Sequence, residues 1–247
     1  MRKALLTIIL ILSLTVSFGQ TLNEKYGRPF VVLIETDPWL MVIGSDVPSF
    51  ALYENGQIIY KKNTDNQLEY FEVKTDRENT QRIIKSFGIT DSLMKQKDYI
   101  KASNWTDQPT NILILNFDTL RQISIYGNLR EKKSEDRAKT PKNFLTVYDN
   151  ILQFNSDSAR IWLPETFEVM ATSYSYSKEQ PIIWNKNWND LNSSTTVKRS
   201  DDLYSIYLNK KDYNDFIKLL KSLKQKQSVE INGKKFSLSY RLPFPNL

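Results

Sequence analysis

The chain has 247 residues, a net charge of +6, and neither histidine nor cysteine. These two absences exclude a Ser-His-Asp triad, a thiol nucleophile, an imidazole proton shuttle and the common kinds of zinc site. Packing alone must hold the fold, because no disulfide can form. Most enzyme classes are therefore disfavoured, and we expect no metal, no cofactor and no catalytic residues of the usual kinds.

The first 19 residues have the pattern of a secretory signal peptide. Arg2 and Lys3 precede an apolar run over residues 4–16, and small residues then lead to Gly19. The run is shorter than the roughly 20 apolar residues that a spanning helix needs. We expect cleavage before Gln20, with no stable membrane insertion afterwards. No cysteine follows to carry a lipid, so the predicted location is periplasmic or secreted.

The mature chain is only weakly basic. Removing Arg2 and Lys3 from the net charge of +6 leaves +4. The remaining basic residues are spread among acidic ones instead of forming a stripe. We therefore expect no nucleic acid as a partner.

The first elements of the mature chain read as strands and a hairpin. Apolar runs at 30–34 and 40–43 have strand length and flank a turn at Asp37-Pro38. Residues 49–61 form a predicted hairpin around Asn55-Gly56, a dipeptide that favours positive φ at both central positions of a type I′ turn. Two further hairpins are predicted at 112–126 and, through Asn232-Gly233, at 229–240.

Three helices are predicted. The first covers 76–87 and is capped by Thr75 or by Asp76, and Glu78 would complete a capping box with Thr75. The second begins at Pro141 and has apolar residues at helical spacing to Leu152. The third covers 211–225 and carries outward lysines, which we interpret as a solvated surface instead of an anion-binding face. Two polar stretches, 130–140 and 185–202, are predicted to be loops.

The predicted fold class is α+β, with antiparallel hairpins and about three helices. With 13 Tyr, 12 Phe and only 7 Gly, the composition favours strands. Strand, helix and hairpin follow one another at 68–126 and again at 203–240. We therefore expect a single domain over 20–247, and two interpretations of its order stay open. The halves, about 20–160 and 161–247, are either a duplication or a chance recurrence.

Both ends of the mature chain resemble a known group. The segment 48–60, Pro-Ser-Phe-Ala-Leu-Tyr-Glu-Asn-Gly-Gln-Ile-Ile-Tyr, resembles one near the mature start of a group of uncharacterised bacterial secreted proteins and lipoproteins. Members of that group tend to close with Gly-x-x-aromatic and then Arg-x-Leu-x-Pro, as here at Gly233 to Phe236 and at Arg241-Leu242-Pro243. The resemblance implies export and a hairpin-rich fold, and it supplies no catalytic residue.

The segment from Trp184 to Asp190 is the candidate binding site. If it is extended, Trp184 and Trp188 project from one face roughly 13 Å apart, a span comparable to a few sugar rings or a short peptide. Lys186 and Asp190, with the intervening asparagines, provide polar contacts. The alternative is that both indoles pack in the core and anchor a loop. Trp39, Trp105 and Trp162 are interpreted as core or turn anchors.

Two classes of function follow from these observations. The first is a binding or interaction module of the cell envelope, whose partner is an envelope protein or a glycan. The second is a glycosidase-like hydrolase, because paired carboxylates need neither histidine nor cysteine. Its candidate acids are Asp37, Glu165, Glu168, Asp190, Asp201 and Asp202. A cleft lined by two acids favours the hydrolase, and an aromatic or flat surface favours binding.

Overall fold

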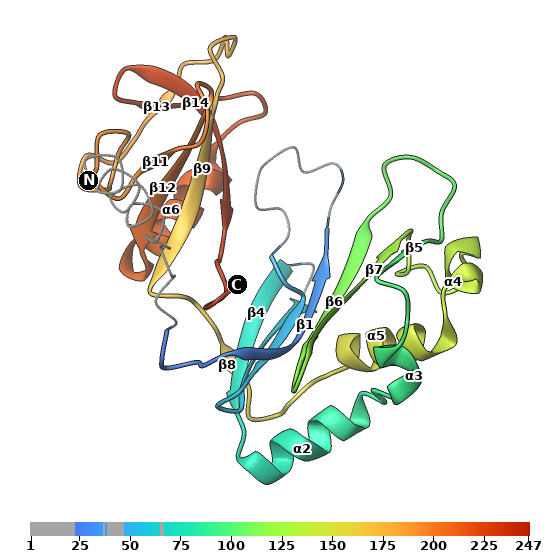
Figure 1. The fold of residues 1–247 in the computed structure, drawn as a ribbon. Helices are drawn as coiled ribbons and strands as arrows, with labels where there is room; N and C mark the ends of the chain where they lie inside the picture. The colour runs from blue at the N-terminus through green and yellow to red at the C-terminus, as the bar shows by residue number, and fades with distance from the viewer. Residues whose placement is uncertain (1–22, 37, 39–46, 65–66) are drawn as a thin grey trace, which may run out of the picture.

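A computed structural model describes residues 23–36, 38, 47–64 and 67–247. The predicted signal peptide, the predicted strand at 40–43, Asp37 and Trp39 lie outside these residues. Within them the chain forms 14 strands in two sheets and five α-helices, three of which have ten residues or more (Figure 1). The predicted α+β class is confirmed.

The first sheet has eight strands, all paired antiparallel except the pair formed by the edge strand β5 and its neighbour β7. In spatial order they are β5 (Tyr99–Lys101), β7 (Leu120–Tyr126), β6 (Thr110–Asn116), β1 (Pro29–Glu35), β2 (Phe50–Tyr53), β3 (Gln57–Thr64), β4 (Gln67–Lys74) and β8 (Arg160–Ile161).

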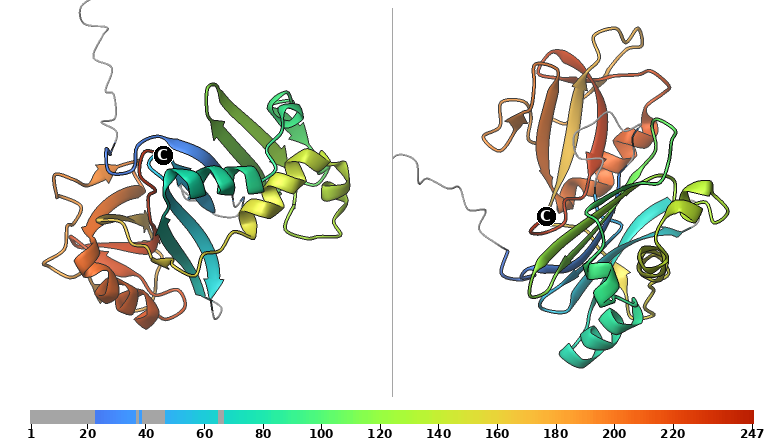
Figure 2. Two further views of the ribbon diagram at one scale, coloured as in Figure 1. Left: turned by 90° about the horizontal axis from the view of Figure 1, so that it is seen from below. Right: turned by 45° about the vertical axis from the view of Figure 1, so that its right-hand side comes forward.

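Helices cover one face of this sheet (Figure 2). They are α2 (Arg77–Ser86), α3 (Asp91–Met94) and α5 (Lys142–Leu152), while the short α4 (Glu135–Lys139) precedes α5. Alternate strand residues such as Leu33 and Ile58 meet Phe87, Leu93 and Phe144 of the helical layer in one buried cluster. Neighbours on the strands, such as Val32 and Ile59, point to the opposite face and join a second cluster.

The second sheet has six strands and a single helix on one face. In spatial order the strands are β10 (Ile182–Ile183), β13 (Val229–Ile231), β14 (Lys234–Arg241), β9 (Thr166–Ser173), β12 (Leu203–Asn209) and β11 (Val197–Lys198). The helix α6 (Tyr213–Ser222) follows a 3₁₀ turn, η1 (Lys210–Asp212). Phe216 of α6 is fully buried against Phe167 of β9, with ring centroids 5.3 Å apart.

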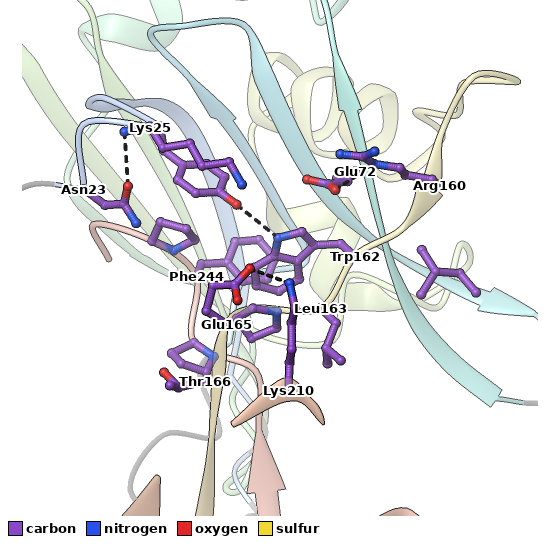
Figure 3. A pocket seen from close by; sticks show the side chains of 15 residues that line it. Asn23, Lys25, Glu72, Arg160, Trp162, Leu163, Glu165, Thr166, Lys210 and Phe244 are labelled. Carbon is purple, nitrogen blue, oxygen red and sulfur yellow. Dashed lines mark hydrogen bonds and ion pairs between the residues drawn. The ribbon is translucent and has the colours of Figure 1, made fainter. Parts of the chain in front are cut away.

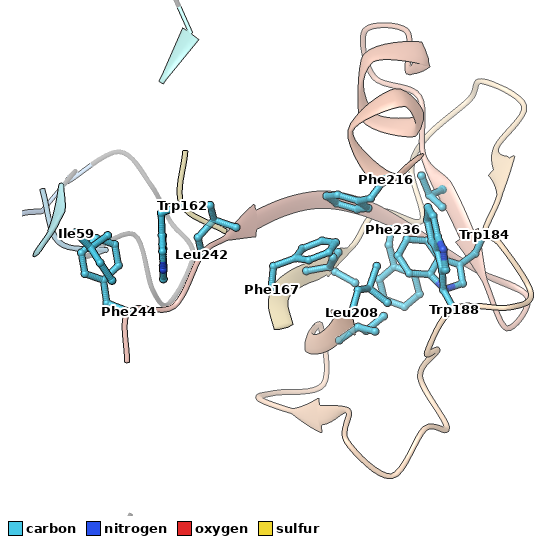
Figure 4. Close-up of a cluster of buried hydrophobic side chains, with 14 of the residues drawn as sticks. Ile59, Trp162, Phe167, Trp184, Trp188, Leu208, Phe216, Phe236, Leu242 and Phe244 are labelled. Carbon is cyan, nitrogen blue, oxygen red and sulfur yellow. The ribbon is translucent and has the colours of Figure 1, made fainter. Parts of the chain in front are cut away.

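The chain crosses between the two sheets twice. It leaves β8 through residues 162–165, and it returns after β14 through a tail over residues 242–247. The tail is held on the first sheet, because the Tyr53 hydroxyl donates to the Pro245 carbonyl at 2.9 Å and Asn246 bonds to Asn23 and Gly27. Trp162 and Phe244 fill the space between, so one buried cluster runs from Ile59 to the far end of the second sheet (Figure 4).

The two Asn-Gly turns differ in conformation. Asn232 and Gly233 both have positive φ, as a type I′ turn requires. At the other turn only Gly56 does, and its N–H donates to the Tyr53 carbonyl at 2.9 Å. The prediction of positive φ at Asn55 is therefore wrong. Here a turn is followed by a left-handed glycine, as in longer hairpin loops.

Helix boundaries decide one open prediction and correct two others. Of the two predicted caps of α2, Asp76 takes the position, because its carboxylate accepts from the Asn79 N–H. The third helix ends at Ser222, short of the predicted Gln225. Part of the predicted loop 130–140 is helical, since Ser134 caps α4 through the Arg137 N–H. The hairpins at 112–126 and 229–240, and the helix beginning after Pro141, are confirmed.

The strand, helix and hairpin order recurs, but the two hairpins join their sheets differently. In the first sheet, three strands separate the β6–β7 hairpin from β4, whereas in the second only β9 separates the β13–β14 hairpin from β12. Segments α3 and β5 also interrupt the first half. The duplication stays a prediction.

Candidate functional site

A large hollow lies where the two sheets meet (Figure 3). This junction cleft has a volume of about 790 Å³. Its walls come from four segments that are distant in sequence: residues 23–26, Glu72 of β4, residues 160–166 and the tail residues 243–245, with Lys210 at one side. Pockets of this size at the junction of two units are typical ligand sites.

Aromatic rings form the floor of the junction cleft. Trp162 and Phe244 meet edge to face with centroids 5.0 Å apart, and the Trp162 indole N–H approaches the Tyr26 hydroxyl at 3.5 Å. All three side chains are almost fully buried, so they are fixed before any ligand arrives. Pro164, Pro243 and Pro245 line the same cleft and stiffen the two crossing segments.

Ion pairs form the rim. Arg160 donates to Glu72 at 2.9 Å, and Glu72 also accepts from Gln57 at 2.9 Å. Lys210 meets Glu165 at 2.5 Å. Among the described residues Lys25 has no carboxylate partner, and its ammonium lies 5.3 Å from the Tyr26 ring centre. The rim therefore has one uncompensated positive charge above an apolar floor.

This arrangement suits binding better than acid–base chemistry. The two acids that line the cleft are Glu72 and Glu165. Glu165 is 75% exposed, and both Glu72 and Glu165 already face a cation. No group of three or more potential metal-ligating side chains occurs among the residues described.

The structure places Trp184 and Trp188 in the core of the second sheet (Figure 4). They are 6% and 8% exposed, and their rings meet edge to face at 4.9 Å instead of lying roughly 13 Å apart. Strand β10 ends at Ile183, and the Trp188 N–H bonds back to the Asn185 carbonyl in a turn. The expectation of an extended segment is therefore wrong, and the anchoring alternative describes the two indoles.

The polar members of that segment remain at the surface. Lys186 is exposed. Asp190 caps a turn, accepting from Asn232 at 2.9 Å and from the Asn192 N–H at 2.9 Å. The hydrogen bond from the Asn232 side chain is the largest cause of a lowered pKa of Asp190. The segment therefore ties the β13–β14 turn to a loop, and a recognition role for Lys186 and Asp190 stays a prediction.

The other predicted acids are scattered. Glu168 is buried on β9 between Arg241 and Arg199 and is not part of the lining of the junction cleft. Asp201 and Asp202 border a separate hollow of about 530 Å³, and Asp201 pairs with Lys198 at 2.7 Å. Among the predicted acids that the structure describes, only Glu165 lines the junction cleft, where the other acid is Glu72.

Sequence reasoning missed most of the junction cleft. Trp162 was interpreted as an anchor, which its burial confirms, but no local pattern indicated that Phe244 and Tyr26 would join it. Trp105, also interpreted as an anchor, is 77% exposed. Nearby prolines are the one available signal: Phe244 lies between Pro243 and Pro245, and Pro164 is two residues after Trp162.

Comparisons with protein-family models, with curated proteins and with solved structures find no match for this chain. None of the helices in the described part of the chain has the length and apolar character to cross a bilayer. The case for function therefore rests on the junction cleft itself.

Proposed function

We propose that this protein is an exported, non-catalytic binding module of the cell envelope that takes a protein or a glycan segment in the junction cleft. The observation that carries the proposal is the preformed aromatic floor of Trp162 and Phe244 beneath a rim of ion pairs, in a hollow of about 790 Å³. Apolar walls with a few polar groups are the usual features of a ligand site.

Export is supported by the sequence. The positive start at Arg2 and Lys3, the short apolar run and the small residues before Gln20 are what a signal peptidase substrate has. The likeness to secreted proteins at residues 48–60 and 233–243 points the same way. We therefore place the mature chain in the periplasm or the medium.

The alternative is a glycosidase-like hydrolase that uses Glu72 and Glu165, which line one cleft. Two acids in a cleft are what such a reaction needs. Both carboxylates are already engaged by ion pairs, with Arg160 and with Lys210, so a sugar oxygen would have to compete with these partners. We therefore rank the hydrolase second.

Two probes test the proposal on the mature chain: a display library of random dodecapeptides and a hexamer of N-acetylglucosamine. We expect one of them to bind, and we expect Lys25→Ala combined with Lys210→Ala to weaken that binding. The matched control is Lys218→Ala with Lys221→Ala on exposed positions of α6, which removes the same charge. Equal loss in both double variants would contradict the cleft as the site.

The same protein separates binding from hydrolysis. If the hydrolase is correct, the chain cleaves the hexamer or an aryl glycoside, and Glu72→Gln with Glu165→Gln abolishes cleavage. If the binding module is correct, cleavage is absent with the wild-type chain, and the double glutamine variant still binds.

A further inference from the structure

Strand β8 ends the first sheet and borders the junction cleft. It follows β4 in the strand order, with no strand beyond it among those described. Its residue Ile161 and the following residues to Pro164 line the cleft (Figure 3). An edge strand presents a row of backbone groups that another chain can pair with.

The pairing register shows which backbone groups face outward. The Trp162 N–H donates to the Tyr70 carbonyl of β4 at 2.8 Å, and Ile161 is opposite Phe71. In an antiparallel pair, hydrogen-bonded and non-hydrogen-bonded positions alternate. Ile161 is therefore at a non-hydrogen-bonded position, and its N–H and carbonyl point away from β4. No hydrogen bond from beyond β8 reaches these groups within the described ranges.

The side chains around this edge are arranged for an extended occupant. The Ile161 side chain is 65% exposed on one face of the sheet, and Trp162 is on the other face, in the floor of the cleft. A strand laid beside β8 would direct successive side chains alternately toward these two apolar surfaces. Lys25 supplies the uncompensated positive charge, which favours an acidic residue in the occupant.

We propose that the ligand of the junction cleft is an extended peptide segment with an acidic residue, which adds to the first sheet as a strand beside β8. Main-chain hydrogen bonds to Ile161 give affinity, and the alternating side chains give specificity. This inference rests on the proposed function and narrows its ligand from a protein or glycan to a protein segment.

The test removes one backbone donor. Ile161→Pro deletes the outward N–H but none of the bonds to β4, and proline is tolerated where an edge strand faces outward. Ile161→Val is the matched control, because it keeps the N–H and a β-branched side chain. The ligands are dodecapeptides selected by display on the wild-type mature chain, and affinity and melting temperature are measured for both variants.

We expect Ile161→Val to bind as the wild type does and Ile161→Pro to bind about tenfold more weakly. A second measurement needs no protein variant. Methylating the backbone amides of a selected peptide one at a time should weaken binding chiefly at the amide that donates to the Ile161 carbonyl, because β8 has two residues and Ile161 is the one that faces outward. This readout stands even if Ile161→Pro fails to fold.

The other outcomes are distinguishable. Selected peptides that bind Ile161→Pro with unchanged affinity, or whose binding no single amide methylation weakens, overturn strand addition but leave the cleft as a binding site. Binding of the sugar hexamer alone, lost with Lys25→Ala and Lys210→Ala, overturns the peptide but keeps the proposed function. If neither probe binds the wild-type chain, both proposals fail.

Discussion

This molecule has two clusters of buried aromatic side chains, one in a closed core and one that lines the junction cleft. In the core of the second sheet, Trp184 and Trp188 pack on each other and on Phe216, with centroids 4.9 to 6.4 Å apart. Where the two sheets meet, Trp162 and Phe244 are also buried, but they form the floor of the junction cleft. The difference shows that the spacing of two tryptophans in the sequence does not by itself indicate a binding site. The junction cleft exists because segments distant in the sequence meet there.

Trp188→Ala is expected to have the largest effect, and it tests whether Trp188 is a core residue. We expect a loss of about 3–5 kcal/mol in the free energy of unfolding, because a large buried ring is replaced by a cavity. Trp105→Ala, at a site 77% exposed, is the control and should change stability by less than about 0.5 kcal/mol. Urea denaturation measures both. A stable Trp188→Ala that no longer binds ligand would move the site to the Trp184 to Asp190 segment.

The two turn glycines differ in the same way, because Gly56 is closely packed and Gly233 is not. At Gly56, φ is +81° and an added Cβ would lie 2.3 Å from the Thr75 carbonyl oxygen. At Gly233, φ is +75° with nothing within 4 Å. We expect Gly56→Val to cost about 3 kcal/mol from strain and overpacking, and Gly233→Val about 1 kcal/mol from strain alone. Equal melting temperatures for the two variants would contradict the packing around Gly56.

A pH measurement tests the closed interior of the first half. Burial alone would raise the pKa of Glu35, but the hydrogen bonds and charge of Arg130, with hydrogen bonds from Ser49 and Tyr148, lower it below its ordinary value of 4.5. A carboxylate whose pKa is lower in the folded than in the unfolded state stabilises the fold at pH values above the unfolded pKa. That stabilisation is lost as the pH falls through the folded-state pKa.

Glu35→Gln should therefore cost about 2 kcal/mol at pH 7, as expected for hydrogen bonds to a charged group, and less as the pH falls below 4.5. Chemical denaturation at a series of pH values checks this. The control is Asp98→Asn, whose carboxylate is 76% exposed in its pair with Arg121. A cost for Glu35→Gln that does not change with pH would contradict the charged network.

The smallest stability effect is expected at the cleft rim. Lys210→Ala removes a pair in which the side chains are 47% and 75% exposed, so the cost should be no more than about 1 kcal/mol. Ligand binding, in contrast, should weaken and become less dependent on salt. A large loss of stability with unchanged binding would show that the rim belongs to the closed interior.

The sequence predicted what depends on local pattern. The hairpin at Asn232-Gly233 and the helix after Pro141 follow from turn chemistry and apolar spacing, and both are confirmed. Local pattern left Thr75 and Asp76 open as the cap of the first helix, and Asp76 takes the position because Thr75 bonds to the Gly56 carbonyl of the neighbouring turn. That competition arises from tertiary contact and has no local signature.

The junction cleft was beyond prediction for the same reason. It needs the tail residue Phe244 to return to a sheet built from the first half, where Tyr53 holds Pro245. No sequence pattern pairs residues almost 200 positions apart. The strand β8, only two residues long, is also too short to recognise from periodicity.

The most direct test of the account uses the five tryptophans as reporters. Indole N–H signals of the ¹⁵N-labelled mature chain, assigned with single Trp→Phe variants, are followed while a bound dodecapeptide or sugar hexamer is titrated. The account predicts that the Trp162 signal, from the floor of the junction cleft, shifts with ligand while the Trp184 and Trp188 signals stay in place. Shifts at Trp184 and Trp188 with an unmoved Trp162 signal would contradict it.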